Sequence, residues 1–168
     1  MNNRKFYTCC FTGHRPNKLP WRYKEQGIRF LFFKIRLKQM IKFAIKCGYK
    51  YFISGMALGS DILSAEIIIN LKQKHPAIEL ECAIPCVNQT EKWSKNSIER
   101  YKNILFKADK ITYVSTSKYF SGCMTQRNNY MIENSSLIIA IYNGISGGTK
   151  STIDKAKEKG LIIKIVRP

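Results

Sequence analysis

Residues 51–61 of the chain read YFISGMALGSD: a short apolar run, a glycine-bearing turn, and a polar start to the next segment. The same order recurs in FYTCCFTGHRP at residues 6–16 and in LIIAIYNGISGGT at residues 137–149. When strands are parallel, the turns at their carboxyl ends share one edge of the sheet, and ligands bind there. Glycine lets backbone N–H groups approach a phosphate without a Cβ in the way. The repeated turns therefore predict a nucleotide-type ligand.

Strand-like and helical segments alternate along the whole chain. Apolar runs predict strands at 5–12, 51–54, 78–84, 111–114, 137–142 and 161–166, and helical periodicity predicts helices at 23–47, 61–74, 90–108, 124–134 and 150–159. Such alternation is typical of a parallel sheet covered by helices on both faces. We therefore expect an α/β fold, a Rossmann-like three-layer domain with a mainly parallel sheet, and a single domain over residues 1–168.

The predicted helix at 23–47 carries both apolar and basic residues at helical spacing. Its core-facing stripe is predicted to be Ile28, Leu31, Phe32, Ile35, Ile41, Ala44 and Ile45. Four lysines recur every fourth residue, at positions 34, 38, 42 and 46. We interpret these lysines as a solvated helix face in preference to a nucleic-acid groove, because no row of aromatic side chains accompanies them.

Composition and charge limit the partners, the location and the metal sites that this chain can have. The chain has 168 residues and a formal net charge of +18, which attracts polyanions. It contains no apolar run of the roughly 20 residues that a membrane helix needs, and its first residues do not resemble a signal peptide. A cytoplasmic location without membrane contact is expected. The six cysteines have no zinc-ligand spacing and are interpreted as buried free thiols. Neither a metal nor a cofactor is expected.

Several motifs in order along the chain resemble the SLOG superfamily, named for the DNA-processing (Smf) and LOG proteins, and within it the YpsA/YoqJ-like branch of small bacterial and phage proteins. They are FTGHRP at 11–16, ISGMALGSD at 53–61, AIPC at 83–86, and GGT at 147–149. Single residues add to them, namely Gln89, Trp93, Cys123, Met124, Arg127, Asn128, Tyr130 and Met131. The resemblance implies a Rossmann-like fold with a ligand pocket at the strand ends and a homo-oligomer.

One departure from the LOG-type hydrolases bears on catalysis. Those enzymes carry Pro-Gly-Gly-x-Gly-Thr-x-x-Glu, in which the glutamate assists loss of the base. Here the glycine pair of residues 147–148 is followed directly by Thr149, and Thr152 stands where the glutamate would be counted. The resemblance therefore gives no support to N-glycosidic hydrolysis, and no catalytic residue is assigned.

The first two turns supply part of the candidate ligand-binding set. Gly13 is expected to let the first turn approach the ligand. Arg15 contacts a phosphate or carboxylate of the ligand or, equally, pairs with Asp61. Asp61 is either the N-cap of the helix at 61–74 or a ribose contact. The full set in this part of the chain is Gly13, His14, Arg15, Ser54, Gly55, Met56 and Asp61.

The rest of the candidate set follows the later strands. Trp93 either stacks on a base, with Gln89 reading the base edge, or closes the core, which is the commoner role of a Trp in an apolar stripe. Arg127 is a candidate phosphate contact, and Thr149 is predicted to be the N-cap of its helix. The residues in this part are Pro85, Gln89, Trp93, Arg127, Asn128, Tyr130, Gly147, Gly148 and Thr149.

Three functions remain open at this point. The first is a binding protein for a phosphorylated, nucleotide-derived small molecule such as an ADP-ribose-like signal, acting as a sensor or as a sequestering sponge. A sponge of this kind, made by a phage, would remove a signal of the host's anti-phage defence. The second is a nucleotide N-glycosidase or phosphoribohydrolase, for which Asp61, Glu66, Glu91 and Glu133 are the available carboxylates. The third is a single-stranded DNA-binding module, which the net charge favours.

Overall fold

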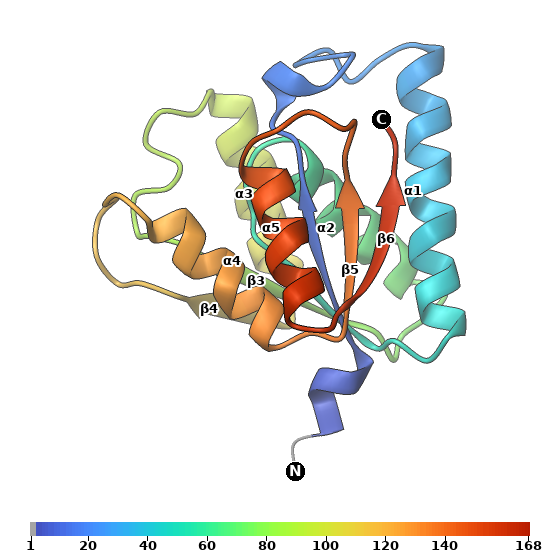
Figure 1. The fold of residues 1–168 in the computed structure, drawn as a ribbon. Helices are drawn as coiled ribbons and strands as arrows, with labels where there is room; N and C mark the ends of the chain where they lie inside the picture. The colour runs from blue at the N-terminus through green and yellow to red at the C-terminus, as the bar shows by residue number, and fades with distance from the viewer. Residues whose placement is uncertain (1–2) are drawn as a thin grey trace.

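A computed structural model describes residues 3–168 and contains one six-stranded sheet in which every pairing is parallel (Figure 1). The strand order is β4-β3-β2-β1-β5-β6. The strands are β1 (Thr8–Gly13), β2 (Tyr51–Ser54), β3 (Glu79–Ile84), β4 (Lys110–Tyr113), β5 (Leu137–Ile141) and β6 (Ile162–Val166). The chain thus builds outward from β1 in one direction, through β4, and then returns to place β5 and β6 on the other side of β1.

Five α-helices cover the sheet in two layers. They are α1 (Ile28–Lys46), α2 (Ser60–Lys72), α3 (Lys95–Lys107), α4 (Cys123–Glu133) and α5 (Gly148–Glu158), with short 3-10 helices η1 (Asn3–Tyr7) and η2 (Pro16–Lys18). One apolar core holds the buried side chains of α1, α2 and α3, and a second holds those of α4 and α5. The predicted Rossmann-like three-layer fold is confirmed. No helix within residues 3–168 is long and apolar enough to cross a membrane.

The central strands supply both cores because successive side chains of a strand point to opposite faces. Cys9 belongs to the core under α1 to α3, and Cys10 belongs to the core under α4 and α5. Every residue of β5 is buried. All six cysteines are free thiols, and only Cys47 is exposed. The sequence therefore specifies a sheet that is apolar on both faces, as a parallel sheet requires.

Three element boundaries differ from the sequence-based prediction by more than two residues, each for a local reason. The helix predicted at 23–47 begins only at Ile28, because Gly27 adopts a φ of +86° and interrupts the helix. The helix predicted at 90–108 begins at Lys95, where the hydroxyl of Ser94 accepts a hydrogen bond from the backbone N–H of Ser97. The first strand begins at Thr8, since the preceding residues form η1.

The predicted core stripe of α1 is wrong at most positions. The residues that α1 buries are Phe30, Phe33, Leu37, Ile41 and Ala44. Only two of the seven predicted positions are among them, and Ile28, Leu31, Phe32 and Ile35 are exposed. The helix carries apolar residues at three- and four-residue spacing on two faces, so periodicity alone does not identify the buried one. The second apolar face remains at the surface.

We expect Gly13→Ala to lower the free energy of unfolding by about 1–3 kcal/mol, the usual cost of overpacking. A Cβ at Gly13 would lie 2.5 Å from Cβ of Ser60 and 2.8 Å from Cβ of Ile141, both in neighbouring elements. The matched control is Gly148→Ala, whose Cβ would meet no atom within 4 Å. Urea denaturation of both variants checks this, and equal stabilities would contradict it.

Candidate functional site

A pocket of about 270 Å³ lies at the carboxyl ends of β1 and β5. The chain order reverses direction between these two neighbouring strands, and ligands of open α/β sheets bind at such switch points. We call this cavity the rim pocket. It is lined by Phe11, Thr12, Gly13, His14, Arg15, Asn17, Lys18, Ala57, Asp61, Met124, Arg127, Asn128, Met131, Gly147, Gly148, Thr149 and Thr152.

Two basic side chains reach the rim pocket from the turn after β1. Backbone N–H of Lys18 donates to the carbonyl of Arg15 at 3.0 Å, which closes the short helix η2 and brings both residues to one side. Both side chains are exposed, and within residues 3–168 neither forms an ion pair with a carboxylate. Arg15 therefore does not pair with Asp61, one of the two roles that the sequence left open. The turn offers two cations to an anionic ligand.

His14 joins the turns after β1 and β5. Its Nε2 lies 2.5 Å from Oδ1 of Asn143, and its Nδ1 lies 3.4 Å from Oγ1 of Thr149. The ring is 3% exposed and packs against Tyr142, with ring centroids 5.6 Å apart. Burial lowers the pKa of His14, the nearby charge of Lys18 lowers it further, and the contact with Asn143 opposes both. The neutral imidazole is therefore the form that the fold favours.

The start of α5 forms another wall of the rim pocket. The helix begins at Gly148 after Gly147, whose φ is +143°, so the predicted N-cap role of Thr149 is wrong. The first N–H groups of a helix have no partner within it and carry the positive end of its dipole. A Cβ at Gly147 would lie 3.0 Å from Nζ of Lys18, while the space beside Gly148 is open. Lys18 and the helix start therefore bring positive charge to the same corner.

Asp61 and Arg127 form a buried ion pair behind the pocket. Nη1 of Arg127 lies 3.4 Å from Oδ2 of Asp61 and also donates to the carbonyl of Gly55. Oδ2 of Asp61 accepts a hydrogen bond from backbone N–H of Ala57 at 3.3 Å. Burial raises the pKa of the Asp61 carboxyl, and the guanidinium of Arg127 opposes that rise. Asp61 is the second residue of α2, which Gly59 caps, so the predicted N-cap role is not observed.

Asn128 and Thr152 connect α4 to α5 at the pocket wall. Nδ2 of Asn128 donates to Oγ1 of Thr152 at 2.9 Å, and Oγ1 of Thr152 donates to the carbonyl of Gly148 at 2.8 Å. Oδ1 of Asn128 accepts from Nε of Arg127 at 2.9 Å. Thr152, at the position where LOG-type hydrolases carry glutamate, is thus a structural link that fixes the start of α5.

Three candidate residues of the second turn lie behind the pocket. Oγ of Ser54 donates to the carbonyl of Asp61 at 3.0 Å and accepts from backbone N–H of Met56 at 3.2 Å. Met56 is fully buried and has a φ of +56°. A Cβ at Gly55 would clash with the guanidinium of Arg127 and the carboxylate of Asp61. These residues shape the turn so that Arg127 can reach across it.

Four further candidate residues lie away from the rim pocket. Pro85 is buried at the end of β3, and Nε2 of Gln89 donates to the carbonyl of Met56 at 2.7 Å. The Trp93 ring packs edge-to-face on Tyr101, with centroids 5.5 Å apart, and contacts the core under α1 to α3. The hydroxyl of Tyr130 donates to Oε1 of Glu81 at 2.5 Å. Trp93 therefore has the core role, which the sequence analysis favoured over base stacking.

The structure brings nine of the sixteen candidate residues together around one cavity: Gly13, His14, Arg15, Asp61, Arg127, Asn128, Gly147, Gly148 and Thr149. Sequence reasoning missed Lys18 and Thr152, which line the same cavity. Two spacings carried the signal. Lys18 lies three residues after Arg15, one 3-10 turn away, and Thr152 lies four residues after Gly148, one helical turn away.

The YpsA family model, described as the YspA SLOG family, matches residues 9–162. The chain belongs to this family. Among its relatives, a UPF0398 protein of Bacillus pumilus (strain SAFR-032) is 27% identical over 148 residues, which cover 88% of this chain and 79% of that protein. The SPbeta prophage-derived protein YoqJ of Bacillus subtilis (strain 168) is 36% identical over 137 residues, which cover 74% of this chain and 80% of that protein.

Two solved structures of larger proteins share the fold. DNA processing protein A from Helicobacter pylori, described for its single-stranded DNA binding mode, superposes with a TM-score of 0.63 at 17% identity. DNA processing protein A from Streptococcus pneumoniae superposes with a TM-score of 0.64 at 14% identity. The superpositions cover 94% and 96% of this chain but only 64% and 50% of those proteins. At these identities they establish the common Rossmann-like architecture.

We expect Asp61→Ala to lower the free energy of unfolding by about 3–5 kcal/mol, because it leaves the buried Arg127 charge without a partner. The matched control is Asp154→Ala, which removes an exposed ion pair between Asp154 and Lys150 one helical turn apart. That variant should unfold like the wild type. A urea titration showing equal losses in the two variants would contradict the buried pair's role.

We expect the stability of the wild type to fall more steeply than that of His14→Gln as pH drops below about 6.5, the ordinary pKa of histidine. The folded-state pKa of His14 is lowered, so the unfolded chain binds the proton first and acid favours unfolding. The stabilisation is complete above that pH and is lost as pH falls through it. Chemical denaturation between pH 8 and pH 5 measures the slopes, and parallel curves would refute the expectation.

Proposed function

We propose that the chain binds a phosphorylated, nucleotide-derived small molecule in the rim pocket. One observation carries this proposal: Arg15 and Lys18, both exposed and both without a carboxylate partner within residues 3–168, converge with the start of α5 beside Gly148. Cationic side chains and free helix N–H groups are the donors that phosphates prefer. The pocket volume of about 270 Å³ fits a phosphate and an attached ribose better than a complete dinucleotide.

The carboxylates support binding without hydrolysis. Asp61 is the only carboxylate among the residues that line the rim pocket, and Arg127 and backbone N–H of Ala57 already engage it. Glu66 pairs with Arg100, and Glu91 accepts a hydrogen bond from Asn88. Neither of these carboxylates nor that of Glu133 lines the rim pocket. Thr152 occupies the position of the glutamate in LOG-type hydrolases. A general acid or base needs a carboxyl group within reach of the scissile bond, so we favour a sensor or a sequestering protein.

The relationship to a prophage-derived protein bears on the biological role. YoqJ shares 36% identity with this chain over 137 residues. A protein that binds a nucleotide-derived signal without destroying it would lower the free concentration of that signal. In a phage setting, such a protein would protect the phage from a host defence that depends on the signal. We extend the proposal to that role.

Single-stranded DNA is a second candidate ligand. The net charge of +18 and the fold shared with a DNA-binding DNA processing protein A favour it. Binding through the backbone phosphates predicts an affinity that falls steeply with salt. Binding of a small molecule in the rim pocket predicts a much weaker salt dependence and competition by free nucleotides.

We expect Arg15→Ala and Lys18→Ala each to weaken ligand binding by about tenfold, the loss of one charge-assisted hydrogen bond. Isothermal titration of ribose 5-phosphate, AMP, ADP-ribose, its cyclic isomers and cyclic dinucleotides measures the affinity. The matched control is Lys107→Ala, which removes an exposed lysine at the end of α3, outside the rim pocket. Gly148→Ala should weaken binding while it leaves the unfolding free energy unchanged, because its Cβ projects into open space.

Two results would overturn the proposal. One is the absence of binding below the millimolar range for every compound in the panel. The other is equal loss of affinity in Lys107→Ala and in the two rim variants, which would show general surface attraction. Incubation with a panel of nucleotides, followed by product analysis, tests hydrolysis separately, and release of a free base would make the protein an enzyme.

A further inference from the structure

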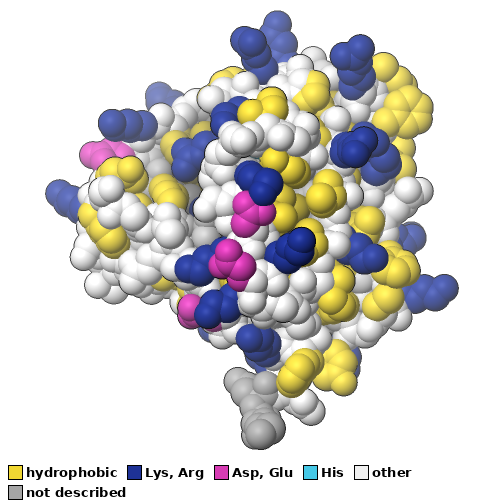
Figure 2. Space-filling view, viewed as in Figure 1, with side chains coloured by type: hydrophobic (Ala, Val, Ile, Leu, Met, Phe, Trp, Pro, Cys, Tyr) yellow, Lys and Arg dark blue, Asp and Glu magenta, His cyan; other side chains and the backbone are white. Residues whose placement is uncertain are grey.

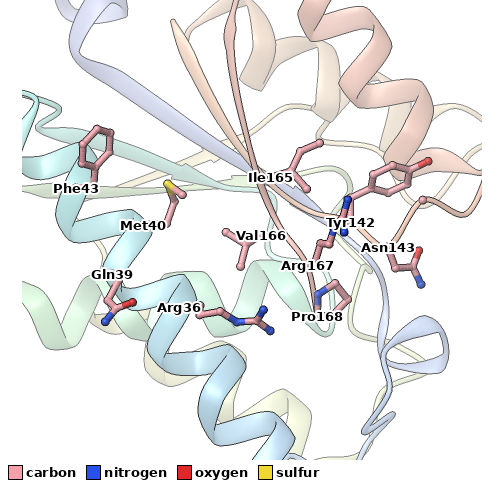
Figure 3. Close-up of a pocket in the computed structure, with 11 residues that line it drawn as sticks. Arg36, Gln39, Met40, Phe43, Tyr142, Asn143, Ile165, Val166, Arg167 and Pro168 are labelled. Atoms are coloured by element: carbon pink, nitrogen blue, oxygen red, sulfur yellow. The ribbon is translucent and has the colours of Figure 1, made fainter.

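The edge of the sheet at β6 carries a groove that shares no lining residue with the rim pocket. One hollow of about 1140 Å³ lies between α1 and the end of β6, and a second of about 360 Å³ continues along the same seam. Met40 and Phe43 line both hollows. In Figure 3, side chains of α1 form one wall, and β6 with the end of β5 forms the other. We call this surface the edge groove.

The backbone of β6 offers unpaired hydrogen-bonding groups along the edge groove. Backbone N–H of Ile162 donates to Ser136, and the carbonyl of Val166 accepts from Tyr142, so these residues face β5. Neighbouring residues of a strand direct their N–H and C=O groups to opposite edges. Ile163 and Ile165 therefore present theirs outward, where no further strand pairs in residues 3–168. An exposed strand edge of this kind is a template for another strand.

The chemistry of the edge groove is apolar and basic. Phe43, Ile162 and Ile165 are 51%, 54% and 49% exposed. The basic residues along it are Arg36, Lys164 and Arg167, and no Asp or Glu lines either hollow. The adjoining helix α1 carries six Lys or Arg residues and no acidic residue. Figure 2 shows hydrophobic and basic side chains intermingled on this side of the molecule, while the acidic side chains in view lie over α5 and beyond it.

We propose that the edge groove binds an extended acidic segment of a partner protein, which adds a strand to β6. Backbone groups of Ile163 and Ile165 would supply the strand pairing, and Met40, Phe43 and Ile162 would receive alternate apolar side chains. Acidic side chains on the segment would meet Arg36, Lys164 and Arg167. Aliphatic side chains outnumber the aromatic ones of Phe43, Tyr49 and Tyr142 along the groove, and the open backbone edge of β6 suits a peptide strand better than stacked bases.

Charge argues against a second copy of the chain at this edge. Two copies paired through β6 would bring two acid-free, lysine- and arginine-rich α1 surfaces together, and like charges in an interface oppose association. The homo-oligomer expected from the family resemblance would therefore use another surface. The edge groove is complementary to an acidic partner instead.

Fluorescence anisotropy with a labelled short peptide of alternating glutamate and valine tests this proposal. We expect saturable binding that is about tenfold weaker for the lysine–valine counterpart, as charge complementarity requires. Ile165→Pro removes an outward N–H, which an edge strand tolerates, and should also weaken binding about tenfold. The matched control is Phe106→Ala, which removes a side chain that is 87% exposed on α3, and it should bind like the wild type.

Circular dichroism shows whether Ile165→Pro still folds, and a double variant tests the proposal if it does not. Arg36→Glu combined with Arg167→Glu should reverse the preference in favour of the lysine–valine peptide. Equal binding of the glutamate–valine peptide to wild type and to this double variant would overturn the proposal, as would no binding at all. So would a wild-type dimer that Ile165→Pro dissociates in sedimentation, or cosedimentation with phosphatidylserine vesicles that Phe43→Glu abolishes.

Discussion

The buried ion pair between Asp61 and Arg127 connects the two helical layers at the carboxyl ends of the strands. Asp61 lies in the first turn of α2 on one face of the sheet, and Arg127 extends from α4 on the other. Arg127 also donates to the carbonyl of Gly55, so the pair fixes the turn after β2. Two desolvated charges are costly unless they are paired and further hydrogen-bonded. The pair satisfies this condition, and in doing so it forms the rear wall of the rim pocket.

The turn glycines near the rim pocket differ in whether a Cβ would fit at their position. Gly13 and Gly55 are required because neighbouring side chains fill the space that a Cβ would occupy. A Cβ at Gly148 would have no neighbour within 4 Å, and this residue lines the open space of the pocket. The sequence pattern treats all three as equivalent turn glycines. Only packing separates the two glycines that the fold needs from the one that borders open space.

The sequence predicted the sheet well because its signals are local. Each of the six strands was expected within a few residues of its place, since apolar runs between turns are characteristic of buried parallel strands. Long-range packing decided what the sequence left open. The choice of the buried face of α1 depends on which helix side meets the sheet, and the role of Trp93 depends on Tyr101. Tyr130 follows the motif but turns toward Glu81, a residue 49 positions earlier.

Strand order also determines when the rim pocket exists. β1 pairs with β5 from Cys9↔Leu137 to Gly13↔Ile141, so the two sides of the pocket come from opposite ends of the chain. During synthesis, β1 to β4 and their helices emerge before β5 and the start of α5. Pairing between such distant segments is slow because closing the long intervening loop costs entropy before the contacts form. The pocket is therefore complete only after residues 137–149 have been made and β5 has paired with β1, and a nascent or truncated chain that lacks β5 has no rim pocket.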